Sequence, residues 1–366
     1  MAAASNKDSE GITILVVCAL AEEALGFKKV LEQNKITPQL KDNTFQCNFE
    51  GYEIIIVWER PGYIACKGLI DKWVSKIGKQ RIKLLIMTGI CAGLKEETWL
   101  GDIVVADLVY DYATGMKITE NLPPQFEVYD QIKLNSEIRK WADLRAADKE
   151  NPAWQDFIPL FKPPTRDHIK EHTLDLLSNG KTEDQIIETI KQQFSDKYHE
   201  TIENNVKYEI QVLKDQGFIK KTENSSYSLT EQGTNKIDEL KRNAIIHKRK
   251  FPYNNSKCPR LFVAGLACGP EVRKDKFIEK LVQFAGHRKT LAVDMESYAI
   301  MKTGSDENIP ACVVKSVSDY GDNDKNDEYH SYAAQTSAAF VLCMIRDYLP
   351  KIGKSDAASG SLHNKQ

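Results

Sequence analysis

The stretch Lys83-Leu84-Leu85-Ile86-Met87-Thr88, followed directly by Gly89-Ile90-Cys91-Ala92-Gly93, decides the fold class of this chain. Its first half is almost continuously apolar, which is typical of a strand whose two faces are both buried. Its second half begins and ends with glycine, which predicts a flexible turn directly after the strand. Such a strand is typical of the interior of an α/β sheet, where both faces are covered.

Alternating strand and helix patterns surround this stretch. Apolar, β-rich runs predict strands at 12–18, 52–58, 102–110, 260–266, 290–293 and 310–317. Apolar residues at helical spacing predict helices at 21–33, 64–77, 274–284, 296–303 and 328–348. The alternation predicts an α/β domain that is discontinuous in sequence, built from residues 11–164 and 251–350.

The segment 165–250 interrupts the alternation with charged helices. It contains helical patterns at 167–177, from Thr182 and at 200–215, β-rich runs at 217–221 and 227–233, and a closing helical pattern at 236–242. A Thr182-x-x-Gln185 capping box marks the start of the second helix. The order resembles a winged helix-turn-helix, so we expect a small inserted domain of that kind over 165–250.

The bulk composition narrows the class of protein. The chain has 366 residues, 42% of them hydrophobic, and a formal net charge of -2, which gives no general attraction to nucleic acid or anionic membrane. No apolar run reaches the roughly 20 residues that span a bilayer. Eight cysteines form no Cys-x-x-Cys pair, so we expect buried thiols in a reducing cytoplasm. Polar composition predicts disorder at 1–10 and 351–366.

Four short segments at the ends of predicted strands carry the chemistry. They are Ala19-Leu20-Ala21-Glu22-Glu23, Thr88 to Leu94, Val293-Asp294-Met295-Glu296-Ser297, and Ser318-Asp319. In open α/β sheets ligands bind beyond the carboxyl ends of the strands. We therefore expect these segments, with their carboxylates, to meet at one site.

The order and spacing of the four segments resemble the nucleoside phosphorylase and nucleosidase superfamily. The similarity covers roughly 12–115 and 258–348, includes Gly101-Asp102-Ile103-Val104-Val105, and is greatest to methylthioadenosine/S-adenosylhomocysteine nucleosidase-like domains. The resemblance implies a phosphorylase-type three-layer α/β/α fold with a central mixed sheet. It also implies cleavage of a purine N-glycosidic bond.

The resemblance assigns a role to each acid. Cleavage builds an oxocarbenium-like transition state, and the purine leaves best when N7 is protonated, a task for a carboxylic acid. Asp319 matches that acid, with Ser318 orienting it, and Glu296 matches the glutamate that holds the ribose hydroxyls. Met295 would pack on the sugar, and Glu23 would activate water. Each acid also has a purely structural explanation, as a turn cap or a first-turn helix residue.

Further contacts follow from the same resemblance. The residues expected to touch substrate are Ile90, Cys91, Ala92, Gly93, Val272, Arg273 and Lys315. Lys315 stands where arginine is common, Ile90 where a small polar residue is usual, and the segment 268–274 lacks the usual stacking aromatic. These departures leave the 5′ substituent open. We expect neither a metal nor an organic cofactor.

Hydrolysis and phosphorolysis remain alternatives. Hexameric phosphorylases carry an arginine just before the glycine turn, where this chain has Met87. Glu22 and Glu23 would repel phosphate and could activate water, which favours a nucleosidase, whereas Arg60 keeps a phosphorylase open. An aspartate at 319 suits adenine as the base.

The partners follow from these assignments. Related nucleosidase domains in bacterial antiviral systems act on adenine nucleotides, and Lys117, Arg273 and Lys274 could meet phosphates, so the expected ligand is an adenine nucleoside or nucleotide. Family members are usually homodimers or larger. Residues 166–242 contain 12 Lys/Arg and 15 Asp/Glu, so the inserted domain is expected to bind protein rather than DNA. A nucleoside-sensing regulator without turnover is the remaining alternative.

Overall fold

The computed structural model divides the chain into two compact units, 1–159 with 258–366, and 160–257. The structure describes residues 12–95, 97–113, 116–117, 125–126, 131–147, 157, 166–192, 194, 198–222, 227–236, 238, 259–270, 278, 281, 289–322, 327 and 329–349. In this part of the chain, no helix combines the length and apolarity that crossing a bilayer demands. Its cysteines are free thiols, all of them buried except Cys47.

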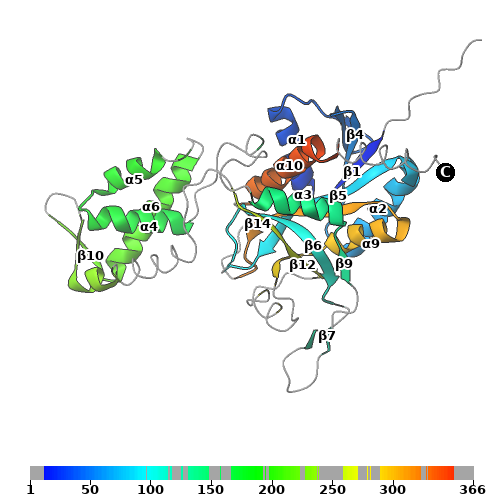
Figure 1. Cartoon of the computed structure of the whole chain (residues 1–366). Coiled ribbons are helices and arrows are strands. Elements are labelled where there is room, and N and C mark those ends of the chain that lie inside the picture. The colour runs from blue at the N-terminus through cyan, green and yellow to red at the C-terminus, as the bar shows by residue number, and fades with distance from the viewer. Residues whose placement is uncertain are drawn as a thin grey trace, which may run out of the picture. The chain divides into compact units, whose positions relative to one another are not determined.

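A mixed sheet forms the centre of the larger unit (Figure 1). Its strands are β1 (Thr13–Cys18), β2 (Gln39–Lys41), β3 (Thr44–Phe49), β4 (Tyr52–Trp58), β5 (Ile82–Gly93), β6 (Ile103–Asp111), β9 (Gln131–Lys133), β12 (Leu261–Cys268), β13 (Thr290–Asp294) and β14 (Ala311–Asp319). They are ordered β13-β12-β6-β14-β5-β1-β4-β3-β2, and β9 pairs with β6. Two further short strands, β7 (Met116–Lys117) and β8 (Gln125–Phe126), pair with each other.

Helices cover both faces of the sheet. One layer consists of α1 (Ala21–Gln33), α3 (Ser136–Ala147) and α10 (His330–Asp347). The other consists of α2 (Tyr63–Ile77) and α9 (Ser297–Glu307), and a short 3-10 helix, η1 (Lys79–Arg81), follows α2. The fold is therefore a three-layer α/β/α arrangement around a central mixed sheet, as the sequence predicts.

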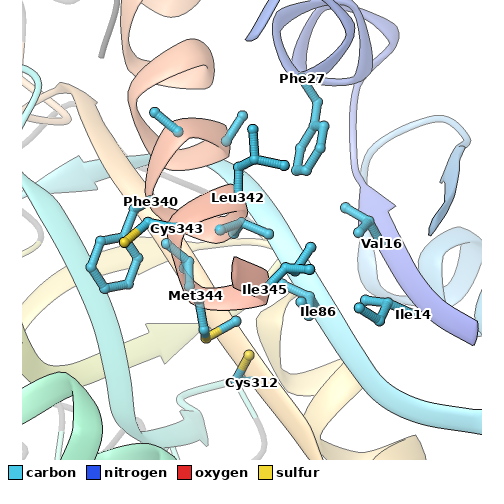
Figure 2. Packing of buried hydrophobic residues seen from close by; sticks show 14 of the residues in the cluster. Ile14, Val16, Phe27, Ile86, Cys312, Phe340, Leu342, Cys343, Met344 and Ile345 are labelled. Atoms are coloured by element: carbon cyan, nitrogen blue, oxygen red, sulfur yellow. The ribbon is translucent and has the colours of Figure 1, made fainter. Parts of the chain in front are cut away.

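The alternation of side chains along the strands explains the two layers. Ile14 and Val16 of β1 pack with Phe27 and α10, whereas Leu15 and Val17 pack with the α2 and α9 layer. Figure 2 shows the first of these clusters, in which side chains of α10 meet those of β1 and β5. All six residues of β1 are buried. This burial on both faces explains why apolar and polar residues do not alternate along the strand.

The predicted turn at Gly89–Gly93 is wrong, because β5 continues through it to Gly93. The second half of β5 pairs in parallel with β14 and in antiparallel with β13, at Ala92 and Gly93. Since β13 also pairs with β12, the strands β5, β14, β6, β12 and β13 close into a ring. Ring closure supplies the backbone partners that keep this glycine-containing segment extended.

Other elements agree with the sequence to different degrees. Helix α1 and strand β4 have the predicted bounds. The β2–β3 hairpin and α3 were not predicted, because their short or charged segments lack a clear apolar period. The helix predicted at 274–284 lies largely outside the described residues.

The smaller unit contains three helices and a two-stranded antiparallel pair. These are α4 (Arg166–Ser178), α5 (Glu183–Lys191), α6 (His199–Asp215), β10 (Ile219–Lys221) and β11 (Tyr227–Leu229). The predicted capping box is confirmed, because Gln185 N donates to Thr182 Oγ1 and Thr182 N donates to Gln185 Oε1. A helical turn at 231–236 begins earlier than the closing helix predicted at 236–242. The winged-helix assignment stays a prediction.

Candidate active site

A cavity of about 230 Å³ lies beyond the carboxyl ends of β1, β5, β13 and β14. Its wall comprises Ala19, Leu20, Glu23, Pro61, Ile90, Cys91, Ala92, Val293, Asp294, Met295, Glu296, Ser318, Asp319 and His330. Three acids that the sequence separates by up to almost 300 residues thus face one space. This meeting of the strand ends is the arrangement expected of a ligand site in an α/β fold.

Glu23 is fixed by backbone donors in the first turn of α1. Its Oε2 accepts from Ala19 N at 2.7 Å and Leu20 N at 3.0 Å, and its Oε1 accepts from Ile90 N at 2.8 Å. The side chain is only 2% exposed. Gly89, at φ +148°, makes this position possible, because a Cβ there would overlap the Glu23 carboxylate. The loop and β5 together therefore hold Glu23 in one orientation.

Glu296 occupies the N-cap position of α9, directly after β13. Its Oε1 accepts a 2.7 Å hydrogen bond from Gly62 N, which follows β4. Burial raises the pKa of Glu296 from 4.5 to about 7, opposed by Lys315 and supported by the charge of Asp294. Glu296 consequently changes its protonation near neutral pH.

Asp319 is the last residue of β14, and its position depends on an irregularity of that strand. The register of β14 against β5 shifts between Val317 and Asp319. Such a bulge re-aims neighbouring side chains, and here the Ser318 hydroxyl donates to Asp319 Oδ2 at 3.0 Å. Gly321 N donates to Asp319 Oδ1 at 2.8 Å. The Ser318 hydroxyl thus restrains the Asp319 carboxylate.

A buried lysine lies behind the cavity wall. Lys315 is 0% exposed, and its Nζ lies 3.3 Å from Asp294 Oδ2 and 4.0 Å from Glu23 Oε1. Asp294 also accepts from the Ser297 hydroxyl at 2.6 Å, at the start of α9. Lys315 therefore connects the element that carries Glu23 with the element that carries Glu296.

The structure sorts the predicted contact residues into three groups. Met295, Ser318, Ile90, Cys91 and Ala92 line the cavity together with the three acids. Gly93 and Lys315 do not line it: Gly93 packs against Thr98 and Val317, and Lys315 points into the protein. Val272 and Arg273 lie outside the described residues, as does Lys274.

Sequence reasoning did not select two ionisable wall residues, Asp294 and His330. Asp294 stands two residues before Glu296, and the same strand-end position could have identified it. His330 follows no strand, so no comparable signal existed. Arg60, the cation that kept phosphorolysis open, is exposed and does not line the cavity.

Acidic side chains dominate the cavity wall. Four acids line it, whereas no lysine or arginine does so among the described residues, and His330 is the one wall side chain there that can carry positive charge. In the same part of the chain, no cluster of three or more His, Cys, Asp or Glu side chains is arranged to hold a metal ion. The site offers carboxylates to a ligand that donates hydrogen bonds or accepts protons.

Comparison with solved structures shows a similar fold. A provisionally assigned 5′-methylthioadenosine/S-adenosylhomocysteine nucleosidase of Francisella philomiragia aligns over 92% of this chain and 99% of its own, with 15% identity and a TM-score of 0.51. Futalosine hydrolase of Helicobacter pylori aligns over 92% and 97%, with 14% identity and a TM-score of 0.48. The alignment with the Francisella philomiragia structure shows that this chain shares its fold.

Sequence comparison gives a shorter match. Sixty-three residues, 17% of this chain, are 35% identical to ATP nucleosidase Cap17 of Escherichia coli. The chain spans 12% of the length of that relative in the match. No protein-family model matches the chain.

Proposed function

We propose that this protein is a purine nucleosidase, a hydrolase that cleaves the N-glycosidic bond of an adenine nucleoside or nucleotide. The observation that carries the proposal is the convergence of Glu23, Glu296 and Asp319 on one cavity from three different strand ends. The fold of nucleosidases supports it. The short match to ATP nucleosidase Cap17 supports the inclusion of nucleotides among the substrates.

In the proposed reaction, Asp319 donates a proton to N7 of adenine as the bond from C1′ to N9 breaks. Glu296 uses its second carboxylate oxygen, Oε2, to accept from the ribose hydroxyls, since Oε1 is occupied by Gly62 N. Met295 packs against the sugar. Adenine leaves as the neutral base, and the ribose cation at C1′ is captured by water.

Glu23 is suited to position that water. A carboxylate offers about four lone-pair sites, and three backbone N–H groups occupy three of them at Glu23. The remaining site can accept a hydrogen bond from water and then receive its proton. Water thus adds a hydroxyl to C1′, and the carboxylate holds the released proton.

Hydrolysis is favoured over phosphorolysis by the charge of the wall. A phosphate nucleophile would lie among four acids without a lysine or arginine contact from the described residues. Incubation with methylthioadenosine, S-adenosylhomocysteine, adenosine, AMP, ADP and ATP, with and without phosphate, tests the proposal by release of free adenine. We expect release without phosphate. Strict dependence on phosphate would make the protein a phosphorylase, and no release from any substrate would contradict the proposal.

The proposal includes a homodimer or a larger homo-oligomer. Ile64, at the start of α2, is 85% exposed and lies two residues after Gly62, the backbone contact of Glu296. Because burial of apolar surface is favourable, a second copy that covered Ile64 would be stabilised at this position. Light scattering measures the mass in solution, and a monomer at micromolar concentration would exclude this assembly.

For the smaller unit we propose a protein partner rather than DNA. Glu203 of α6 pairs with Lys191 at 2.9 Å and with Lys207 at 2.7 Å, so these cations are compensated. DNA affinity depends on cations that neutralise phosphates. Fluorescence anisotropy with duplex DNA at low salt tests this, and salt-sensitive binding would favour DNA.

A further inference from the structure

The turn at 99–102, between β5 and β6, contains the Gly101-Asp102 pair of the sequence motif, and the proposed reaction gives this pair no role. Asp102 is 1% exposed and does not line the cavity. Its Oδ2 accepts from Trp99 N at 2.8 Å, and its own N donates to Trp99 O at 3.0 Å. Asp102 therefore closes the turn with both its carboxylate and its backbone N–H.

Arg260, the residue before β12, holds the Asp102 carboxylate. Its backbone N donates to Oδ1 at 2.9 Å, and its guanidinium donates to Oδ2 from Nε at 3.0 Å and from Nη2 at 2.6 Å. Nη2 also donates to Glu97 O at 3.1 Å, and the guanidinium lies 3.8 Å from the centre of the Trp99 ring. Because charge-assisted bonds from a planar guanidinium are strong and directional, Arg260 fixes the orientation of the carboxylate and of the turn.

The turn is bonded to β14 directly before Asp319. Gly101 N donates to Val317 O at 2.8 Å, and Val317 N donates to Asp102 O at 2.9 Å. The Ser316 hydroxyl donates to Gly101 O at 3.0 Å. These bonds continue the antiparallel pairing of β14 with β6 as far as Val317. The turn therefore fixes Val317 from one edge of the strand.

The other edge of β14 carries the bulge. There β14 pairs in parallel with β5, with Val317 opposite Cys91 and Asp319 opposite Ala92. Ser318 is the extra residue between these two pairs, as in a β-bulge. Because Val317 is fixed on both edges, the extra residue is accommodated after it, where it turns the Asp319 carboxylate toward the cavity.

We infer that Asp102, held by Arg260, is a positioning residue for the proposed cleavage: it fixes the turn that restrains Val317 and so keeps the bulge that aims Asp319 at the base. The inference rests on the proposed function, in which Asp319 is the acid. A displacement of about 1 Å at a reacting group can cost up to about 100-fold in rate. The substrate contacts of Glu23 and Glu296 do not pass through this turn. The pair therefore affects kcat rather than KM.

The test begins with Arg260→Gln, which removes the guanidinium bonds and keeps the backbone bond to Asp102. The substrate is the compound of the panel that the wild-type protein cleaves fastest. We expect kcat to fall about tenfold or more, with KM changed less than about twofold. Arg260→Lys keeps a positive charge beside Asp102 and should recover part of the loss. Asp107→Asn is the matched control and should leave kcat within about twofold, because Asp107 joins β6 to Arg139 of α3, at 3.4 Å.

A double-mutant cycle separates positioning of the acid from general stabilisation. In the Asp319→Asn background, Arg260→Gln should lower the residual kcat less than about twofold, because the residue through which the pair acts is already lost. A purely structural role would lower kcat by the same factor in both backgrounds, and that additive result would overturn the inference. An unchanged kcat in Arg260→Gln, or a loss confined to KM, would overturn it as well.

Failure of the proposed function has a different signature, because the wild-type protein would then release adenine from none of the compounds. Hydrogen exchange of the peptide 314–322 then tests the positioning directly. This peptide contains Val317 N, the donor to Asp102 O, and Gly321 N, the donor to Asp319 Oδ1. Faster exchange in Arg260→Gln than in Asp107→Asn would support control of the bulge by the pair. Equal exchange in the two variants would overturn it.

Discussion

Lys315 Nζ lies 3.3 Å from Asp294 Oδ2, and both side chains are buried. Burial would lower the pKa of Lys315, but the charges of Glu23, Asp294 and Glu296 raise it above the ordinary value of a lysine. A charged lysine therefore compensates acids that could not be buried together without it. The polar site is stable because its charges form one cluster.

The first prediction concerns this cluster. Lys315→Met leaves buried carboxylates without a counter-charge, so the free energy of unfolding should fall by roughly 3–5 kcal/mol. Addition of Asp294→Asn should recover part of the loss, because one uncompensated charge is removed. Urea unfolding measures both variants. Equal stability of Lys315→Met and wild type would show that the lysine does not compensate the acids.

Asp319→Asn tests the proposed acid. The amide cannot protonate N7, so we expect kcat to fall by about 100-fold or more, in the range attributed to general acid catalysis. Unfolding should change little, since an amide oxygen can still accept from Gly321 N. Asp322→Asn is the control, because Asp322 pairs with Lys95 and does not line the cavity. A fully active Asp319→Asn would refute the role.

The raised pKa of Glu296 predicts that the activity depends on pH. This pKa of about 7 means that the fraction of free protein with the hydroxyl-accepting carboxylate increases as the pH rises through neutral. We expect kcat/KM to rise with pH through about 7, and Glu296→Gln to remove that rise. An identical pH profile in the variant would assign the titration to another group.

The same shift affects stability. Because the folded pKa lies above the ordinary value of 4.5, the folded state binds the proton more tightly than the unfolded state. The stability that the folded state gains from this tighter proton binding is therefore fully present below pH 4.5 and is lost as the pH rises to about 7. Urea unfolding from pH 5 to 7 should show a smaller decline in stability for Glu296→Gln than for wild type.

Gly89→Ala tests the close contact between β5 and the Glu23 carboxylate. The added Cβ would overlap Glu23, and the alanine would also have to adopt a φ of +148°. Activity should therefore fall more than about tenfold. Gly68→Ala, on α2, is the control, because a Cβ at this position has open space around it. This substitution should stabilise the folded protein by up to about 1 kcal/mol. Steady-state kinetics with adenosine distinguishes the two. Normal activity in Gly89→Ala would show that Glu23 can be displaced without consequence.

Much of the fold could be predicted because its signals are local. The apolar run before Gly89 predicted a strand buried on both faces, and the spacing from Ala21 to Gln33 predicted α1 at its observed bounds. The glycines of β5 were misinterpreted as a turn. Their extended conformation depends on pairing with β13 and β14, which are about 200 residues away in sequence.

The sequence by itself determined which acids stand at strand ends and that helices cover both sheet faces, because residue period and strand-end position are properties of neighbouring residues. The tertiary structure alone decided that Lys315 points inward to compensate Asp294 rather than toward the ligand, and that His330 reaches the cavity from α10. Both depend on the closing of a ring of strands and the packing of α10 beside α1. These are contacts between distant segments, which no local pattern encodes.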